Sequence, residues 1–158
     1  MTDVAELGDD SSIEPSEILY LRVHPDHVVP DHDSPGEYRP DSGSFRRDES
    51  LSVDLASMCT PEQTQDRAGG VPFHVASFSV RDARGEGCRV RREPLPENDA
   101  HALVIGDNAN GKGSLKKIQA KNISKKTQII LWHPHFPKEV YDRKFASVAG
   151  TPPNQVSD

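Results

Sequence analysis

Ala100-His101-Ala102-Leu103-Val104-Ile105 is followed by the glycine-rich run Gly106-Asp107-Asn108-Ala109-Asn110-Gly111-Lys112-Gly113, and then by a segment with more lysines up to Lys126. The first six residues form a short apolar run bounded by turn residues, which is typical of a buried strand. The glycines predict a loop, and the lysine-rich segment predicts a surface helix. This order is common in phosphate-binding sites, because loop amides and a helix start attract an anion. The stretch therefore indicates both a sheet and a candidate site.

The residues before this stretch predict the remaining elements. Leu51, Val53 and Leu55 alternate with polar residues, as in a half-buried strand. Thr60-Pro61-Glu62-Gln63 predicts a helix start with a capping box. Further strands are expected at 18–23, 71–80, 88–92 and 127–132, a helical turn or hairpin connection at 81–87, and a long loop at 24–44. The predicted fold is one α+β domain with a mixed sheet of five to six strands and two helices.

Composition sets the expected limits of that domain. The chain has 158 residues, which suits one ordinary domain. Residues 1–17 contain six acidic residues and three serines, and residues 133–158 contain four prolines. Neither end offers enough apolar surface to offset the cost of ordering the chain. We therefore expect a disordered acidic tail at 1–17, the domain at 18–132 and a disordered proline-rich tail at 133–158.

Charge and cysteine content bear on location and partners. The net charge is −6, but residues 1–58 carry −10 and residues 59–158 carry +4. This asymmetry favours an anionic partner or self-association, although the acidic front could also be a solvating tail. Cys59 and Cys88 show no paired spacing and are expected to be reduced, with a bridge between them left open. The acidic start and the short apolar runs predict a cytoplasmic chain with no membrane segment.

The lysine-rich segment is the first candidate surface. Its lysines are Lys112, Lys116, Lys117, Lys121, Lys125 and Lys126. The first four are the predicted anion-binding residues, for a protein or nucleic-acid partner. On one continuous helix the six would scatter around the circumference, and no aromatic residue interleaves them to stack on bases. A solvated surface helix is the alternative. Nearby arginines would widen the surface if their hairpin lies alongside: Arg81, Arg84, Arg89, Arg91 and Arg92.

The glycine loop matches a nucleotide-binding P-loop only in part. The spacing from Gly106 to Lys112 fits, but Gly113 stands where Ser or Thr should hold magnesium, and Ser114 comes one place late. A plain strand-to-helix loop is the main alternative, and a weaker anion site made of backbone amides stays open. The sequence predicts no cofactor.

Histidines and acids gather in the long loop. His24, His27 and His32 alternate with Asp26, Asp31 and Asp33. Imidazole and carboxylate groups are metal ligands, but the usual paired spacing is missing and the prolines would splay the side chains. His133 and His135 flank a proline in the expected tail. We predict polar loop histidines and no metal site.

Polar residues on the strands form a second candidate site. Arg22 and His24 share one face of the first strand with Tyr20, and Ser52 shares one face of the next with Asp54. His101 begins an apolar strand, where a polar side chain needs a partner. We expect an Asp54–His101 or Asp54–Arg22 pair, which would either order the core or form a ligand pocket.

Parts of the chain resemble known families. Three stretches are similar to a family of small bacterial proteins without assigned activity: Leu19-Tyr20-Leu21-Arg22-Val23-His24-Pro25-Asp26-His27-Val28-Val29, Leu51-Ser52-Val53-Asp54-Leu55, and Pro94-Leu95-Pro96-Glu97-Asn98 with Ala100-His101-Ala102. That resemblance implies a single bacterial domain. Arg22 and the serine-bearing strand 50–54 also resemble an ADP-ribosyltransferase, which implies that they help hold NAD. The catalytic glutamate of that family has no match, since Glu93 and Glu97 lie at a proline turn.

The sequence thus favours an accessory or interaction protein that binds an anionic partner through its lysines. The alternative is an enzyme with a nucleotide-type pocket formed by Arg22, His24, Ser52, Asp54 and His101. The sequence does not indicate an oligomeric state.

Overall fold

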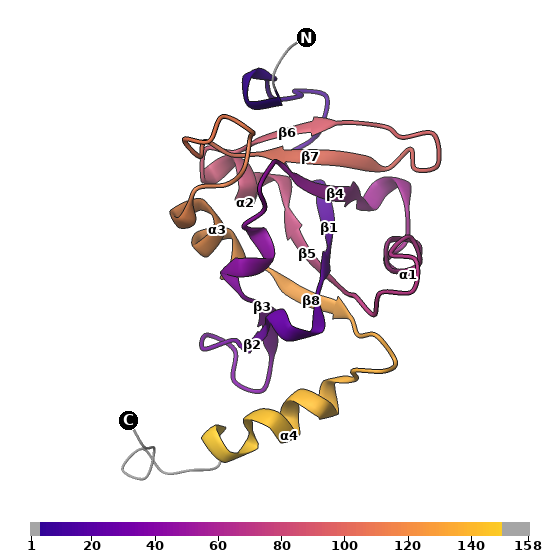
Figure 1. Cartoon of the computed structure of the whole chain (residues 1–158), viewed down its shortest axis with the longest axis vertical. Helices are drawn as coiled ribbons and strands as arrows, with labels where there is room; N and C mark the ends of the chain where they lie inside the picture. The colour runs from indigo at the N-terminus through magenta and orange to yellow at the C-terminus, as the bar shows by residue number, and fades with distance from the viewer. Residues whose placement is uncertain (1–3, 150–158) are drawn as a thin grey trace.

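The computed structural model describes residues 4–149, and Figure 1 shows their arrangement. The strands are β1 (Ile18–Val23), β2 (Val28–Pro30), β3 (Tyr38–Pro40), β4 (Leu51–Leu55), β5 (His74–Ser79), β6 (Arg89–Arg92), β7 (His101–Ile105) and β8 (Gln128–Leu131). The α-helices are α1 (Pro61–Asp66), α2 (Val80–Gly85), α3 (Lys117–Ser124) and α4 (Lys138–Ala149). The α+β class and the single domain are confirmed.

Six of the strands form one sheet in the order β6-β7-β4-β1-β5-β8, and β2 and β3 form a separate hairpin. Every pair in both sheets is antiparallel, so the expectation of a mixed sheet was wrong. Residues 4–149 contain four α-helices instead of the two expected. The additional two are α2, left open as a turn or a hairpin connection, and α4, which lies in the expected C-terminal tail.

The inner face of the six-stranded sheet carries the hydrophobic core. Alternate residues of the central strands enter it, as the period of a strand requires. These are Leu19, Leu21 and Val23 of β1 and Leu51, Val53 and Leu55 of β4. Apolar residues of α2 and α3 join the same core, and Figure 1 shows both helices on one side of the sheet, with α1 on the other. The outer face is therefore the polar one, and α1 covers part of it.

Helix α1 begins as the sequence predicts. The Thr60 side chain accepts from the Gln63 amide at 3.1 Å, and the Gln63 side-chain oxygen accepts from the Thr60 amide at 2.9 Å. These reciprocal bonds satisfy two amides that the helix leaves unpaired. The capping box is confirmed.

The folded part extends beyond the predicted limits of 18–132. Tyr141 of α4 is 2% exposed, and Trp132, Phe136 and Phe145 pack against the core beside it. At the other end Ile13 is buried, and the Asp10 amide donates to the Val90 carbonyl at 2.9 Å. The ordered part therefore includes residues 4–17 and 133–149 and is longer than the expected 18–132, because a few large apolar side chains anchor these polar segments. Residues 1–3 and 150–158 lie outside the described part.

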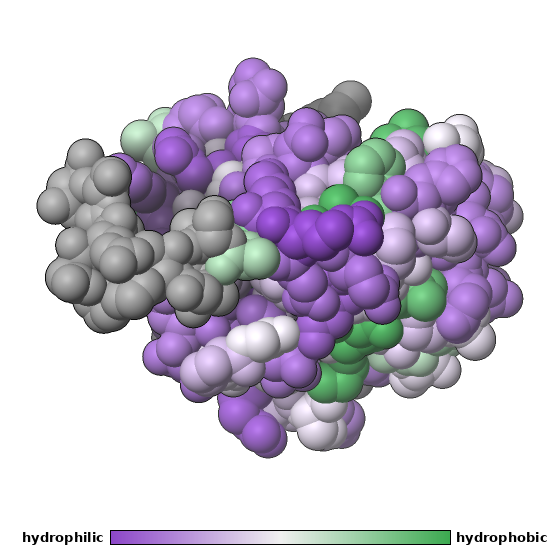
Figure 2. Space-filling view, turned by 90° about the horizontal axis from the view of Figure 1, so that it is seen from below, coloured by the Kyte–Doolittle hydropathy of each residue, from purple (hydrophilic) through white to green (hydrophobic). Residues whose placement is uncertain are grey.

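The long loop expected at 24–44 is ordered into the β2–β3 hairpin and short 3-10 turns. The hairpin lies near α4, and a cavity of about 720 Å³ separates them, with Tyr38 and Phe145 among its lining residues. Seen from this end, the surface is mostly hydrophilic, with hydrophobic residues in small separate groups (Figure 2). None of the helices between residues 4 and 149 is long and apolar enough to cross a bilayer.

Candidate functional site

The antiparallel register brings most of the predicted pocket residues together on the outer face of the sheet. Tyr20 of β1 pairs with Asp54 of β4, and Asp54 pairs with His101 of β7. Together with Arg22, Ser52 and Thr64 of α1, these residues line one hollow. Its volume is only about 10 Å³, which is too small for a nucleotide. The sequence therefore predicted the cluster, but the cluster is packed.

Asp54 explains why this hollow is closed. Its side chain is 4% exposed, and its two oxygens accept from Asn98 Nδ2 at 2.8 Å, Thr64 Oγ1 at 2.7 Å and Arg67 Nη1 at 3.1 Å. A buried carboxylate is tolerated when donors satisfy it in this way. Although Asp54 and His101 are neighbours in the strand register, the Asp54 carboxylate bonds to neither the His101 nor the Arg22 side chain, so the expected side-chain pairs do not form. Instead Asp54 fastens α1 and the turn before β7 to the sheet, which supports its expected role in ordering the core.

His101 has a structural partner of its own. Its Nδ1 lies 2.9 Å from the Glu93 carbonyl oxygen and 3.4 Å from the Glu93 carboxylate. The Glu93 amide donates back to the His101 carbonyl at 2.9 Å. Because the carbonyl oxygen can only accept, Nδ1 is the donor nitrogen of the ring. His101 therefore holds β7 to the end of β6.

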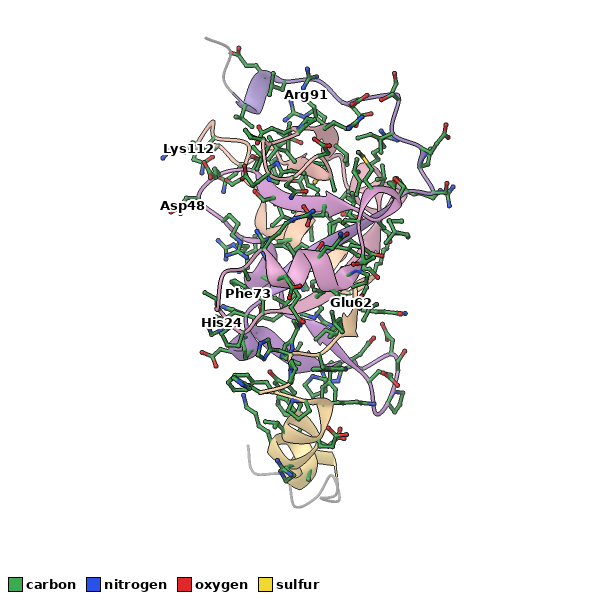
Figure 3. All side chains as sticks on the ribbon, turned by 90° about the vertical axis from the view of Figure 1, so that its right-hand side faces the viewer. His24, Asp48, Glu62, Phe73, Arg91 and Lys112 are labelled. Carbon is green, nitrogen blue, oxygen red and sulfur yellow. The ribbon has the colours of Figure 1, made fainter. Side chains whose placement is uncertain are left out.

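His24 does not join the other pocket residues. It lies just past the end of β1, where its ring meets Phe73 edge to face at 6.2 Å, and Figure 3 shows the two labels close together. Its Nδ1 accepts from the Asp26 amide at 3.1 Å and caps a 3-10 turn. The expectation that His24 belongs to the pocket was wrong, since the chain turns away from the sheet at Pro25.

A larger hollow lies beside the packed cluster. Its volume is about 570 Å³, and its lining residues are Leu21, Arg22, Arg47, Asp48, Glu49, Ser50, Ser52 and Phe73. Arg22 is half-buried, and within residues 4–149 its guanidinium forms no hydrogen bond or ion pair. Ser52 is exposed beside it. A guanidinium carries five N–H donors, so the partly desolvated Arg22 side chain in this hollow can donate hydrogen bonds to an anion.

The glycine loop is not an anion cradle. Most of its amides bond within the chain: among them, Gly106 donates to the Gly113 carbonyl, Asn108 to the Ser114 carbonyl, Lys112 to the Asn110 side chain and Asp107 to the Gln119 side chain. Gly106 is required by packing, because a Cβ there would lie 2.4 Å from the Leu115 Cα. The plain strand-to-helix loop is therefore the better description of this segment than a backbone anion site.

The lysines show an alignment that sequence reasoning missed. Helix α3 begins at Lys117, not at Lys112, so Lys112 and Lys116 lie in the loop. Lys117 and Lys121 lie on α3, and Lys125 is its C-cap residue with helical backbone angles, so the three recur every four residues and span only about 80° of the helix circumference. The predicted scatter around the helix was wrong, because it assumed too long a helix. We call these three residues the lysine face.

The lysine face is open to solvent. Lys117, Lys121 and Lys125 are exposed, as are the other three lysines of the segment. In the described part of the chain, no carboxylate lies within 4 Å of any of these six side-chain amines. Ile118 lies beside the face and is 57% exposed. Positive charge on α3 is therefore available to another molecule.

The nearby arginines do not widen the lysine face. Arg84 pairs with Asp9 at 3.1 Å, and Arg89 pairs with Asp107 at 3.3 Å. Arg89 and Arg91 also donate to backbone carbonyls of the N-terminal segment. These side chains are directed to the N-terminal segment and the glycine loop, so the expected extension of the positive surface was wrong for them.

The histidine loop does not assemble a metal site. Among the residues described, no group of three or more His, Cys, Asp or Glu side chains could hold a metal ion. His27 Nδ1 instead lies 3.1 Å from both Asp41 carboxylate oxygens, and His133 contacts His135 with ring centroids 4.9 Å apart.

A buried histidine was missed by the sequence reasoning. His74 is fully buried at the start of β5, where its Nδ1 accepts from the His133 amide at 2.9 Å. Its Nε2 lies 2.8 Å from the Tyr141 hydroxyl, which donates to the Pro25 carbonyl at 2.8 Å. Burial, with smaller effects of His133 and His24, lowers the pKa of His74 to about 4. A neutral imidazole thus joins three distant segments.

Neither cysteine forms a bridge. Both are free thiols, Cys59 half-buried and Cys88 buried. Burial, with smaller effects of the neighbouring acids, raises the pKa of Cys88 to about 12. Its thiol is therefore protonated at neutral pH and inert as a nucleophile.

Comparison with known proteins gives no relative of this chain: no family model matches, and no similar protein is found among curated sequences or solved structures.

Proposed function

We propose that the chain binds an anionic partner, an acidic protein or a nucleic acid, through the lysine face. The observation that carries the proposal is the alignment of three exposed amines along one side of α3, with no carboxylate of residues 4–149 within 4 Å of them. An amine that already has an internal partner contributes little to a complex, whereas an unpaired one gains a partner on binding. The bacterial origin and cytoplasmic location implied by the sequence are part of this proposal.

The spacing of the amines favours a partner with regularly placed negative charge. Positions four apart on a helix are separated by about 6 Å along the axis. Lys112 and Lys116 in the preceding loop extend the same basic segment. Exposed Ile118 would add apolar contact with a protein, whereas a nucleic acid would use the amines alone. The two partner classes therefore differ in their dependence on Ile118.

The test compares wild type with a Lys117→Gln, Lys121→Gln, Lys125→Gln triple variant on immobilised heparin over a series of salt concentrations. If three anionic contacts are lost, the slope of log affinity against log salt should become less steep by about 2, the value for single-stranded polyanions. The matched control carries Lys138→Gln, Arg143→Gln and Lys144→Gln on α4, which removes the same charge elsewhere.

Equal loss of retention in the two triple variants would mean that only net charge matters and would contradict the proposal. Unchanged retention in the α3 variant would also contradict it. An Ile118→Ser variant then separates the partner classes: weaker binding to polyglutamate but not to a single-stranded oligonucleotide supports a protein.

A second candidate function is binding of a small anionic ligand, such as a nucleotide, in the hollow beside Arg22. The half-buried guanidinium of Arg22, which has no hydrogen-bond or ion-pair partner among the described residues, and the volume of about 570 Å³ favour it. Catalysis has less support, because Asp54 and His101 are held by structural partners and the hollow contains no histidine or cysteine. We therefore favour binding over chemistry at this site.

Thermal-shift measurements with NAD and ATP, each with and without magnesium, test this second function. A ligand that binds only the native state raises the melting temperature by mass action. An Arg22→Gln variant should lose any such shift, while an Arg46→Gln variant should keep it, since Arg46 does not line the hollow. No shift with any ligand, or an equal shift in both variants, would exclude the site.

A further inference from the structure

The N-terminal segment of the chain covers the outer edge of β6, the edge that does not pair with β7. Residues 7–13 run alongside it, as Figure 1 shows at the top of the sheet. The Asp10 amide donates to the Val90 carbonyl at 2.9 Å, and the Val90 amide donates to the Asp9 carboxylate at 2.9 Å. One edge residue thus receives a backbone bond and a side-chain bond from the segment. We call residues 7–13 the latch.

Arginines supply most of the remaining contacts to the latch. Arg84 donates to the Asp9 carboxylate at 3.1 Å, to the Asp10 carbonyl at 2.8 Å and to the Ile13 carbonyl at 2.9 Å. Arg89 donates to the Leu7 carbonyl at 3.2 Å, and Arg91 to the Gly8 carbonyl at 3.5 Å. Four of these five bonds reach backbone carbonyls, and one reaches a carboxylate.

This set of contacts recognises a peptide backbone more than a particular sequence. An extended segment with one acidic side chain at the position of Asp9 would satisfy the same donors. Strand addition at a sheet edge works in this way, because main-chain bonds give affinity and a few side chains give specificity. A nucleic acid fits less well, since the Val90 carbonyl needs a donor that a phosphate does not supply.

We propose that the β6 edge is a binding site for an acidic extended segment of a partner protein, and that the latch occupies it as an intramolecular competitor. The proposal goes beyond the lysine face and does not depend on it. Charge complementarity with Arg84, Arg89 and Arg91 selects an acidic segment. The latch itself shows the geometry that such a segment adopts.

The latch is held weakly enough to be exchanged. Residues 7–12 are exposed or half-buried, and only Ile13, at the C-terminal end of the latch, is buried. Asp10 makes the single backbone–backbone bond between the latch and β6 that the structure describes, whereas β6 and β7 pair over four residues. The latch can therefore detach as far as Ile13 without opening the core.

The test measures binding of a labelled peptide with the sequence of residues 4–14 to the full chain. In an Asp9→Lys variant the latch loses its ion pair with Arg84, so we expect the free peptide to bind at least tenfold more tightly than to wild type. A control Asp33→Lys variant, with the same charge change in the β2–β3 loop, should bind as wild type does. Adding Arg84→Gln to the Asp9→Lys variant should abolish binding.

Several results would overturn the proposal. Absence of peptide binding to the folded Asp9→Lys variant would show that the edge is not a peptide site, and equal tightening in Asp33→Lys would show that only net charge matters. Equal competition by a single-stranded oligonucleotide would replace the peptide with a nucleic acid. Hydrogen exchange on wild type needs no variant: the Asp10 amide should exchange at least a hundredfold faster than the Val104 amide. Equal protection would make the latch a fixed part of the fold.

Discussion

The arginines beside β6 and the lysines of α3 carry the same charge but lie in opposite environments. Arg84 reaches a carboxylate and two backbone carbonyls, while Lys117, Lys121 and Lys125 have no carboxylate of the described chain within reach. A planar guanidinium suits several fixed acceptors at once, whereas an ammonium on a flexible stem stays solvated. The contrast teaches that the number of basic residues does not measure how much positive charge a surface can offer.

The same contrast extends across the molecule. Asp54, His74 and Arg84 are polar groups whose partners lie far away in sequence, and they join separate segments of the fold. Arg22 and the lysine face have no such partners within residues 4–149. We therefore expect substitutions in the first set to alter stability, and substitutions in the second to alter binding.

The largest effect is expected for Asp54→Ala. Removing this carboxylate leaves the Asn98, Thr64 and Arg67 donors without their shared acceptor, so the free energy of unfolding should fall by about 3–5 kcal/mol, as for other broken buried ion pairs. Urea denaturation measures the change. Asp48→Ala, at an exposed acid in the hollow, is the control and should stay within about 0.5 kcal/mol of wild type. If the Asp54→Ala variant keeps the wild-type denaturation midpoint, Asp54 does not stabilise the fold.

Acid should weaken the fold through His74. The unfolded chain takes up a proton near the ordinary pKa of 6.5, but the buried imidazole does so only near 4. The free energy of unfolding should therefore fall as the pH drops from 6.5 to 4, by about 3 kcal/mol in total, and this contribution should level off below 4.

Urea denaturation at several pH values checks this expectation. A His74→Phe variant is less stable at neutral pH, because it loses the bonds to His133 and Tyr141, but its stability should be nearly flat over the same window. If wild type and variant depend equally on pH, His74 does not carry the effect.

A smaller effect is expected for Arg84→Gln. Its bonds to Asp9, Asp10 and Ile13 would be lost, which should lower the free energy of unfolding by about 2 kcal/mol, as for hydrogen bonds to charged groups. Thermal and urea denaturation measure it. If the substitution leaves stability unchanged, the partners of Arg84 do not stabilise the fold and the contrast with the lysines fails.

The smallest effects on stability are expected at the unpaired positions. Lys121→Gln and Arg22→Met should each change the free energy of unfolding by less than about 0.5 kcal/mol, because neither side chain has a hydrogen-bond or ion-pair partner within residues 4–149 to lose. The same denaturation measurements apply. If Lys121→Gln lowers the free energy of unfolding by more than about 1 kcal/mol, the lysine face stabilises the fold, as the arginines beside β6 are expected to do.

The sequence predicted those helices and strands whose signals lie within a few neighbouring residues. The apolar alternation of Leu51, Val53 and Leu55 gives β4, and the Thr60 to Gln63 capping box starts α1. Helix α3 was predicted too long, because lysine content says nothing about where a helix begins. Helix α4 was missed because prolines surround it, although Tyr141 and Phe145 recur at helical spacing.

Contacts between distant segments could not be predicted in detail. Sequence reasoning selected Asp54 and His101 and paired Asp54 with either His101 or Arg22, whereas Asn98 and Thr64 are partners of Asp54, and Glu93 is the partner of His101. The strand register does place Asp54 opposite His101, but the donors to Asp54 come from α1 and from the turn before β7, and composition does not encode how these segments pack on the sheet. The attachment of the acidic N-terminal segment to Arg84 likewise depends on which edge of the sheet is left open.

The lysine face is tested most directly by nuclear magnetic resonance titration of the wild-type chain with a short heparin oligosaccharide. The predicted result is that amide signals of Lys117, Ile118, Lys121 and Lys125 shift with added ligand and return at high salt, while those of Arg89 to Arg92 in β6 stay in place. Shifts centred on β6, with α3 unmoved, would contradict the account.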